Sequence, residues 1–269
     1  MAVPFLKGHG TENDFVLLPD LDGRLDLTPL QVAAICDRRA GLGADGVLRI
    51  VRDTTGAAPW FMDYRNADGS VVEMCGNGIR VFARYLVDAG LAAAGEMSIS
   101  TRDGVKQVRL GDSGDVTVDM GVARFPGPDS IAVAVDGRVW PATAVDMGNP
   151  HAVAFLESLA DAGDLRLPPV VDPAFPDGVN VEFVVRQGAR HLAMRVHERG
   201  VGETRSCGTG ACAAMTAAAR ADGAPHASSY VVDVPGGRLT VATRPDGHVE
   251  LTGPAVIVAC GELAEGFLA

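Results

Sequence analysis

The stretch EMCGNGIR, residues 73–80, places a cysteine directly in front of two glycines that bracket an asparagine. About half the chain length later, RSCGTGAC, residues 205–212, repeats this arrangement around a second cysteine. Glycine beside a thiol removes bulky side chains and lets a ligand approach the backbone closely. Two copies of this motif in one chain of 269 residues indicate an internal duplication, with Cys75 and Cys207 in equivalent positions.

Strand patterns dominate the sequence around the two motifs. Short β-branched segments bounded by glycine or aspartate are typical of strands. Helical patterns are fewer: one follows each motif cysteine, and a third has Thr28 in the N-cap position, Pro29 at the first helical position and Gly41 just past its end. The expected strands cover residues 15–20, 46–51, 105–110, 115–120, 151–156, 179–185, 191–198, 230–235 and 238–244, and the helices after the cysteines cover roughly 78–89 and 210–221.

Turn residues gather at MGVARFPGPDS, residues 120–130, which we take as the domain boundary. We expect one domain over residues 1–123, joined by a last strand near 260–269, and a second over 124–259. The helix after the second cysteine is rich in alanine and has no large apolar face. Small residues all round suit a helix enclosed by a tightly curved sheet, but alanine is also simply a good helix former.

The composition limits the classes of protein to consider. A formal net charge of −11 and a pI near 4.9 argue against a surface for nucleic acid or an anionic membrane. A hydrophobic content of 47% and a mean hydropathy of +0.16 fit a soluble globular protein, and no apolar run reaches spanning length. The five cysteines form no C-x-x-C pair, which favours a reducing, cytoplasmic compartment.

The two motifs predict a site for a small anion beside each thiol. The first N–H groups of a helix have no internal partner, and the helix dipole favours negative charge there. A carboxylate can therefore bind at each helix start, and the same field can lower a cysteine pKa from about 8.5 to roughly 3.5–7.5. Two thiols facing one ligand suggest that a proton leaves one side of a carbon and returns from the other, which inverts the centre by general acid–base catalysis.

With their flanks, these motifs resemble the diaminopimelate epimerases, amino-acid epimerases of lysine and peptidoglycan biosynthesis that work without pyridoxal phosphate. The resemblance runs in order through five blocks that span nearly the whole chain. Related racemases of proline and hydroxyproline typically carry histidine where Asn77 stands, so the motif favours the diaminopimelate branch. The blocks are KGHGTENDFVLL near the N-terminus, NADGSVVEMCGNGIR (66–80), MGNPHAVAF (147–155), GVNVEF (178–183) and ERGVGETRSCGTGACA (198–213).

The resemblance implies a set of site residues. Cys75 and Cys207 would be the two bases, with His151 and Glu198 assisting them. Asn66 and Glu198 each lie nine residues before their cysteine, which supports their equivalence independently. Backbone donors of Gly76, Asn77, Gly208 and Thr209 would bind the carboxylate at the reacting carbon, and the amino groups and distal carboxylate would contact Asn13, Asn66, Asn149, Asn180, Glu198 and Arg199.

The chain departs from this family pattern at one position. Some members carry a substrate-binding glutamine where this sequence has Gly46, which has no side chain to donate. The expected fold is α/β of the α+β type: two pseudo-symmetric domains, each a curved, mostly antiparallel sheet or barrel around a central helix, with the active site in the cleft between them. The expected ligand is a small diamino dicarboxylic acid.

Other functions remain open at this point. A pyridoxal-phosphate racemase needs a Schiff-base lysine, and the only lysines, Lys7 and Lys106, are unattractive candidates. Cys207 and Cys212 do not define four convergent metal ligands, so no metal or cofactor is expected. The alternatives are a racemase of histidine, proline or hydroxyproline, and a thiol redox or binding protein without turnover. The oligomeric state is not fixed by the sequence, and a homodimer is one option.

Overall fold

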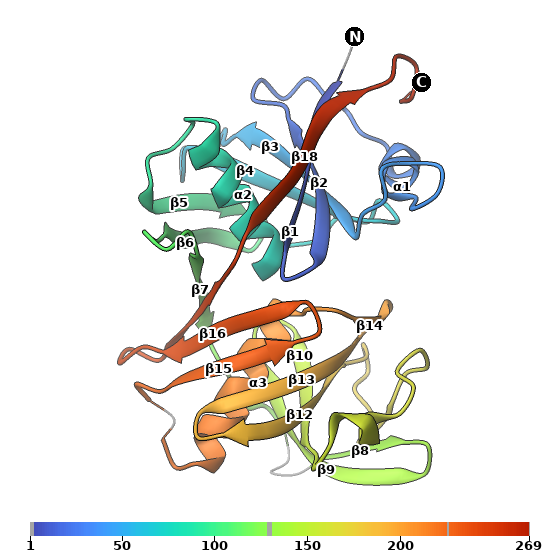
Figure 1. The fold of residues 1–269 in the computed structure, drawn as a ribbon, viewed down its shortest axis with the longest axis vertical. Helices are drawn as coiled ribbons and strands as arrows, with labels where there is room; N and C mark the ends of the chain where they lie inside the picture. The colour runs from blue at the N-terminus through green and yellow to red at the C-terminus, as the bar shows by residue number, and fades with distance from the viewer. Residues whose placement is uncertain (1–2, 128–130, 225, 269) are drawn as a thin grey trace. The chain divides into compact units, whose positions relative to one another are not determined.

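The computed structural model describes residues 3–127, 131–224 and 226–268. They form two compact units (Figure 1). Unit 1 comprises residues 1–118 and 253–269, and unit 2 comprises residues 119–252. The chain therefore passes from unit 1 to unit 2 within one strand, β7, and returns at the end of another, β17. No helix among the described residues is long and apolar enough to cross a membrane.

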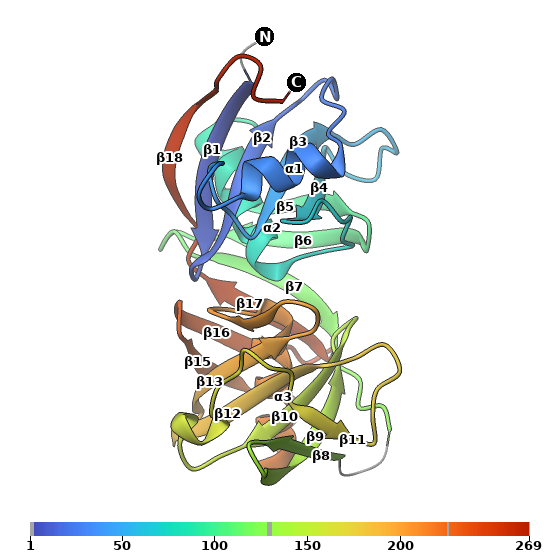
Figure 2. The same cartoon turned by 90° about the vertical axis from the view of Figure 1, so that its right-hand side faces the viewer.

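Unit 1 contains a mixed sheet and two helices. Strand β18 lies antiparallel to β1, so the end of the chain pairs with its beginning (Figure 2). The helices are α1 (Pro29–Cys36) and α2 (Gly76–Asp88). The strands are β1 (Val3–Gly10), β2 (Asn13–Pro19), β3 (Gly46–Arg52), β4 (Trp60–Asn66), β5 (Gly95–Thr101), β6 (Gly104–Leu110), the first part of β7 (Val116–Val122) and β18 (Val256–Leu263).

Unit 2 has more strands and one long helix. The helices are α3 (Gly208–Ala221) and the short 3₁₀ turn η1 (Leu159–Ala162). The strands are β8 (Ile131–Val135), β9 (Arg138–Asp146), β10 (Pro150–Phe155), β11 (Val170–Asp172), β12 (Asn180–Gly188), β13 (His191–Glu198), β14 (Gly202–Thr204), β15 (Ser229–Val234), β16 (Gly237–Thr243) and β17 (His248–Gly253).

The two units share one strand topology. Neighbouring strands follow the order β18-β1-β2-β3-β4-β5-β6-β7 in unit 1 and β8-β9-β10-β12-β13-β15-β16-β17 in unit 2. Along both orders, successive pairs are antiparallel, antiparallel, parallel, antiparallel, parallel, antiparallel and antiparallel. A motif helix precedes the sixth strand of each order, α2 before β5 and α3 before β15. The fold is therefore mixed α/β, mostly antiparallel and internally repeated, as the sequence predicts.

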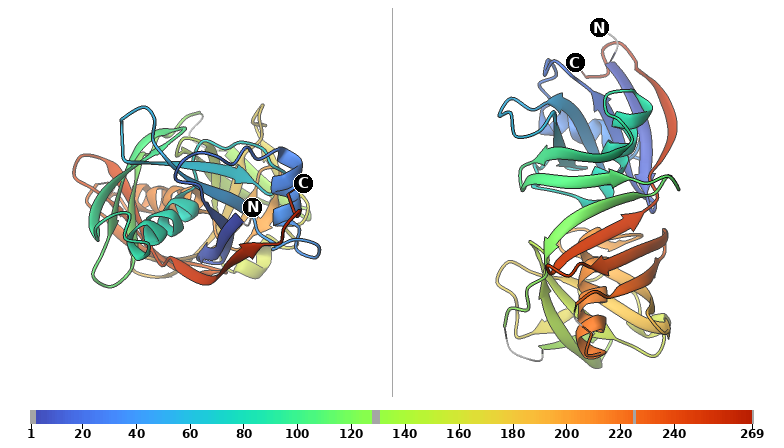
Figure 3. Two further views of the ribbon diagram at one scale, coloured as in Figure 1. Left: turned by 90° about the horizontal axis from the view of Figure 1, so that it is seen from above. Right: turned by 90° about the vertical axis from the view of Figure 1, so that its left-hand side faces the viewer.

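Each motif helix packs against the sheet of its own unit. Helix α2 contacts β1, β2, β3, β4, β6 and β18, and α3 contacts β9, β10, β12, β13, β15 and β16. Figure 3 shows α3, in orange, among the strands of unit 2. Every alanine of α3 before Ala221 is buried, so its small residues do serve a helix enclosed by a curved sheet. They let strands approach the helix closely around its circumference, which large side chains would prevent.

The first helix is shorter than the sequence predicts. Thr28 caps it and Pro29 opens it as expected, but α1 ends at Cys36 rather than just before Gly41. Asp37 stops it, because the Asp37 carboxylate accepts hydrogen bonds from the backbone N–H groups of Arg39 and Ala40 and folds the chain into a turn. A Cβ on Gly41 would lie 2.0 Å from the Ala34 carbonyl oxygen, so only glycine fits this close return.

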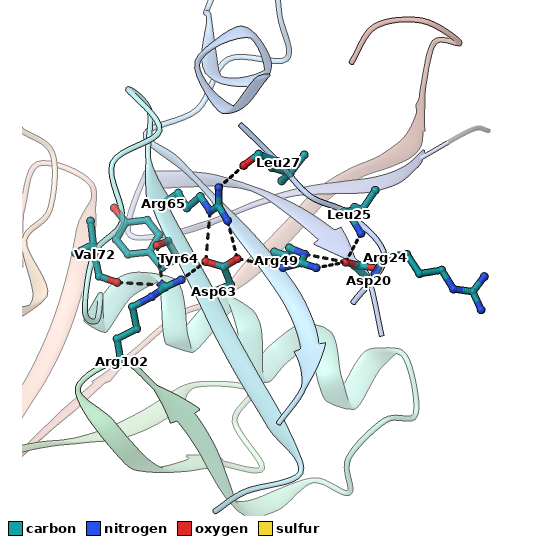
Figure 4. Close-up of polar contacts among 10 residues, drawn as sticks. All are labelled: Asp20, Arg24, Leu25, Leu27, Arg49, Asp63, Tyr64, Arg65, Val72 and Arg102. Atoms are coloured by element: carbon teal, nitrogen blue, oxygen red, sulfur yellow. Dashed lines mark hydrogen bonds and ion pairs between the residues drawn. The ribbon is translucent and has the colours of Figure 1, made fainter. Parts of the chain in front are cut away.

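Strands β3 and β4 carry a buried ionic network on one face of unit 1 (Figure 4). The Asp63 carboxylate, whose side chain is 4% exposed, forms ion pairs with Arg49, Arg65 and Arg102. Arg49 also binds Asp20. Arg102 donates to the carbonyl oxygens of Tyr64 and Val72, and so ties the β5–β6 turn to the loop that leads into the first cysteine motif.

Candidate active site

Both motif cysteines are helix N-caps. Cys75 and Cys207 have extended backbones, and each sulfur accepts a hydrogen bond from the N–H three residues on, of Gly78 and of Gly210, at 3.4 Å. A thiol in this position occupies the place of the usual Ser or Asp cap. Each unit therefore holds one sulfur at the start of its central helix, where unpaired N–H groups gather.

In unit 1 the expected residues Asn13 and Asn77 lie beside Cys75. The Cys75 thiol points to Asn13 Oδ1 at 3.8 Å, and Asn77 Nδ2 donates to the same oxygen at 3.2 Å. Asn13 Nδ2 in turn donates to Asp45 Oδ2 at 2.7 Å, which fixes the orientation of its amide. The Asn13 carbonyl oxygen is thereby aimed at the helix start.

Asn66 is held at the end of β4 by two side chains. The Tyr64 hydroxyl donates to Asn66 Oδ1 at 2.9 Å, and Asn66 Nδ2 donates to Ser70 Oγ at 3.0 Å. Tyr64 also explains Gly46, which pairs with Asn66 across the β3–β4 ladder. A Cβ at position 46 would lie 2.7 Å from Tyr64 Cε2, so the tyrosine ring fills the space of a larger residue there.

In unit 2, His151 is fully buried between Glu182 and Asn149. Its Nδ1 lies 2.7 Å from Glu182 Oε1, and its Nε2 lies 3.0 Å from Asn149 Oδ1. The Thr209 hydroxyl lies 3.5 Å from the Cys207 sulfur. Of the residues expected at the site, Asn149 therefore lies beside His151, and Thr209 lies beside Cys207.

Asn180, Glu198 and Arg199 lie at the adjoining strand ends. Asn180 Oδ1 accepts a hydrogen bond from the Arg199 backbone N–H at 2.9 Å, so β12 positions the turn after β13. Glu198 accepts a hydrogen bond from the Thr204 hydroxyl. The Arg199 guanidinium donates a hydrogen bond to the Asp177 carbonyl oxygen at 2.9 Å. To bind a substrate carboxylate as well, Arg199 has to break this hydrogen bond or use its other N–H groups.

The strand registers place these residues in matching positions of the repeat. Phe15 pairs with Gly46 in unit 1 as His151 pairs with Asn180 in unit 2. Val47 pairs with Arg65 as Val181 pairs with His197, so the next residues along β4 and β13 also correspond. The equivalent pairs are Asn13 and Asn149, Phe15 and His151, Gly46 and Asn180, Leu48 and Glu182, Asn66 and Glu198, Cys75 and Cys207, and Asn77 and Thr209.

Most of the chain matches the model of a known protein family. A family model with the description diaminopimelate epimerase covers residues 5–126 and 143–258. This chain belongs to the diaminopimelate epimerase family. The diaminopimelate epimerase of Streptomyces coelicolor is 59% identical, over 99% of this chain and 97% of the relative. That of Thermobifida fusca is 52% identical, over 96% of this chain and 97% of the relative.

Solved structures share the fold at low sequence identity. A Bacillus anthracis phenazine biosynthesis protein of the PhzF family superimposes with a TM-score of 0.73 at 17% identity and covers 98% of this chain and 99% of its own. A hydroxyproline epimerase from Agrobacterium vitis also gives a TM-score of 0.73, at 14% identity, covering 98% of this chain and 93% of its own. These likenesses establish the fold alone.

The electrostatics of Cys207 differ from the prediction for a helix start. Burial raises the pKa of this thiol well above its ordinary value, and the carboxylates of Glu198 and Glu182 raise it further. Hydrogen bonds from Thr209 and the Gly210 N–H lower the pKa but do not compensate. The prediction of a lowered cysteine pKa is therefore wrong for Cys207, because desolvation outweighs the helix field.

Two residues, one in each unit, escaped the sequence analysis. Tyr64 looks like an ordinary strand residue, and only its contacts with Gly46 and Asn66 give it a place near the motif. Glu182 carried a signal that could have been used: it is a lone charge inside the otherwise apolar strand VNVEFVV, residues 179–185. A charged residue is almost never fully buried unless it is paired, so its partner was worth seeking.

Proposed function

We propose that this protein interconverts LL- and meso-2,6-diaminopimelate without pyridoxal phosphate. One observation carries the proposal: a cysteine caps the central helix at the equivalent position of both halves of a repeated fold. The family membership and the name of the 59% identical relative support the same substrate. In a cell this activity belongs to the cytoplasmic route to lysine and peptidoglycan precursors.

In the proposed mechanism the two cysteines act on one α-carbon. One thiolate removes the α-proton, the electron pair is delocalised into the α-carboxylate, and the opposing thiol delivers its proton to the other face. The first cysteine ends protonated and the second ends as thiolate, so no net redox change occurs. Backbone N–H groups at both helix starts, of Gly76, Asn77, Gly208 and Thr209, stabilise the charge that develops on the carboxylate.

The remaining site residues are proposed to select and hold the substrate. Asn13, Asn66, Asn149 and Asn180 offer amide donors and acceptors to the amino groups, with Glu198 as an anionic partner. Arg199 offers the guanidinium that a second carboxylate needs. His151 contacts Asn149 and Glu182, and Glu182 and the Cys207 sulfur border the same space at Gly210, so the proposed part of His151 is to assist that thiol. A substrate with two zwitterionic ends fits this mixture of donors and charges better than proline or hydroxyproline.

The test is an incubation of the reduced protein with LL-diaminopimelate in D₂O, without added pyridoxal phosphate. The expected result is meso-diaminopimelate with deuterium at the inverted carbon, measured by NMR and chiral chromatography. Histidine, proline and hydroxyproline serve as comparison substrates. Deuterium in one of these and none in diaminopimelate would replace the proposed substrate, whereas no exchange with any amino acid would favour a thiol redox or binding protein.

A further inference from the structure

The strongest unassigned feature is a buried carboxylate next to Cys207. Glu182 is the third residue of β12, and its side chain is 0% exposed. Its Oε1 contacts His151 Nδ1, whereas its Oε2 is buried without a hydrogen-bond partner among the described residues. Burying a charged group in this way is costly, and a fold rarely retains such a group without a specific use.

Glu182 borders the same space as the Cys207 sulfur. A Cβ added to Gly210 would lie 2.7 Å from Glu182 Oε1 and 3.3 Å from Cys207 Sγ. Gly210 therefore opens the helix start to both groups at once. Glu182 Oε1 therefore lies between the start of α3 and the His151 ring.

The other half of the repeat shows what this layer looks like without a charge. The equivalents of His151 and Glu182 are Phe15 and Leu48, which pack behind Cys75. A Cβ on Gly78 would meet Leu48 Cδ2 at 3.1 Å and Phe15 Cζ at 3.5 Å. The fold thus accepts an apolar pair at this place, so the buried histidine–carboxylate pair of unit 2 is not a requirement of the architecture.

We propose that Glu182 is a positioning residue of the epimerisation site, which holds the His151 ring through Nδ1 and keeps a negative charge beside Cys207. With Nδ1 bound to the carboxylate, Nε2 is the nitrogen presented on the side of Asn149. The charge favours the protonated form of Cys207. In unit 1 the apolar side chain of Leu48 takes the equivalent place beside Cys75, so the two thiols have different immediate surroundings. This inference rests on the proposed role of Cys207 as one of the two bases.

The test compares the alkylation rates of individual cysteines. The reduced full-length protein is treated with iodoacetamide at fixed pH, and Cys75 and Cys207 are followed separately by peptide mass spectrometry. Because the thiolate is the reacting form, the ratio of the Cys207 rate to the Cys75 rate reports the charge beside Cys207. Glu182→Gln removes that charge at nearly constant size, and we expect the ratio to rise about tenfold, since a nearby like charge shifts a pKa by about one unit or more.

The matched control is Glu203→Gln, which removes the same charge from β14 of the same unit, where Glu203 pairs with Arg195. It should leave the ratio unchanged. A ratio in Glu182→Gln equal to that of the wild type would overturn the proposal and reduce Glu182 to a packing residue. Should Glu182→Gln not fold, the double variant His151→Phe with Glu182→Leu copies the pair of unit 1 and should raise the ratio in the same way.

A spectroscopic measurement on the unaltered protein checks the other half of the proposal. In protein labelled with ¹⁵N-histidine, His151 should show a slowly exchanging Nδ1–H, assigned by its loss in His151→Phe. Its absence would contradict the hydrogen bond to Glu182. These readouts are independent of turnover, so a failure of diaminopimelate epimerisation in D₂O would refute the proposed function while the charge beside Cys207 could still be measured.

Discussion

At the scale of single residues, the two motif glycines at the third helical position differ in what they face. The Cβ of an alanine at position 210 would press against Glu182 Oε1 at 2.7 Å, an atom fixed by its bond to His151. The Cβ of an alanine at position 78 would meet Leu48 Cδ2 at 3.1 Å, which a small rotation of the leucine can relieve. The glycine at this motif position is therefore more tightly surrounded in unit 2 than in unit 1.

Gly210→Ala should destabilise the protein by about 1–3 kcal/mol, because overpacking a closed site forces neighbours out of place. Gly78→Ala should be nearly neutral, since the higher helix propensity of alanine, worth about 1 kcal/mol, offsets a mild contact. Urea denaturation of both variants measures the difference. Equal losses of unfolding free energy would contradict the account of Gly210.

Residue-scale prediction succeeded where a local rule applied and failed where a partner was remote in sequence. Cys75 and Cys207 could be placed at helix starts because the glycines and the following helical pattern are local signals. The raised pKa of Cys207 could not be foreseen, since it depends above all on burial, and then on Glu198 and Glu182, of which the sequence analysis had identified only Glu198.

At the scale of elements, the ion pairs of Asp63 link the side chains of β3, β4 and the β5–β6 turn. Three guanidinium groups converge on this carboxylate, and its side chain is 4% exposed. Removing one partner from a buried ion pair leaves charges without compensation. Asp63→Asn should therefore cost about 3–5 kcal/mol of unfolding free energy in urea denaturation.

Asp103→Asn is the control for this prediction. It breaks the ion pair with Lys106, in which the Asp103 side chain is 54% exposed. A surface pair of this kind contributes about 0–1 kcal/mol. A loss in Asp63→Asn as small as that in Asp103→Asn would show that the network on β3 and β4 adds little to the fold.

The same carboxylate predicts a pH dependence of stability. Burial raises the pKa of Asp63, but hydrogen bonds from Arg102 and Arg65 and their charges outweigh it and leave the pKa below its ordinary value of 3.8. A lowered folded-state pKa stabilises fully above the ordinary value and is lost as the pH falls through the folded-state value. The stability difference between wild type and Asp63→Asn should be constant above about pH 5 and shrink below about pH 4. A difference that stays constant down to acid unfolding would contradict this assignment.

Element prediction from the sequence was best for strands with an apolar, β-branched pattern. The segments at 46–51 and 105–110 are found as β3 and β6. Strand β4 was missed because WFMDYRN contains no β-branched residue and places the charged Asp63 among its buried residues. The end of α1 was missed because the side-chain bonds of Asp37 stop a helix that the apolar pattern would continue.

At the scale of the whole molecule, the repeat explains why a pair of motifs was informative. The same series of parallel and antiparallel neighbours recurs in both units, so corresponding residues occupy corresponding places. The sequence could predict this duplication from two motifs alone. The sequence could not reveal that Phe15 and Leu48 in unit 1 correspond to His151 and Glu182 in unit 2. This correspondence depends on the register between neighbouring strands that are far apart in the chain.

If each half supplies one base, neither cysteine can replace the other. Cys75→Ala and Cys207→Ala should each lower kcat/KM for epimerisation by about 10²- to 10⁴-fold, the usual contribution of a general acid or base. Cys260→Ser, which changes an exposed cysteine on β18, should keep wild-type activity. Activity retained in either of the first two variants would argue against one base from each half.

The central claim is that two different groups remove and return the proton, and early isotope distribution tests it most directly. LL-diaminopimelate is incubated with the wild-type protein in D₂O and stopped after a few per cent conversion. Two bases predict one deuterium at the inverted carbon of the meso product and none in the remaining LL substrate, because the proton removed on one side is never the one returned on the other. Deuterium appearing in the LL substrate as fast as in the product, or product that retains its original proton, would contradict the two-thiol account.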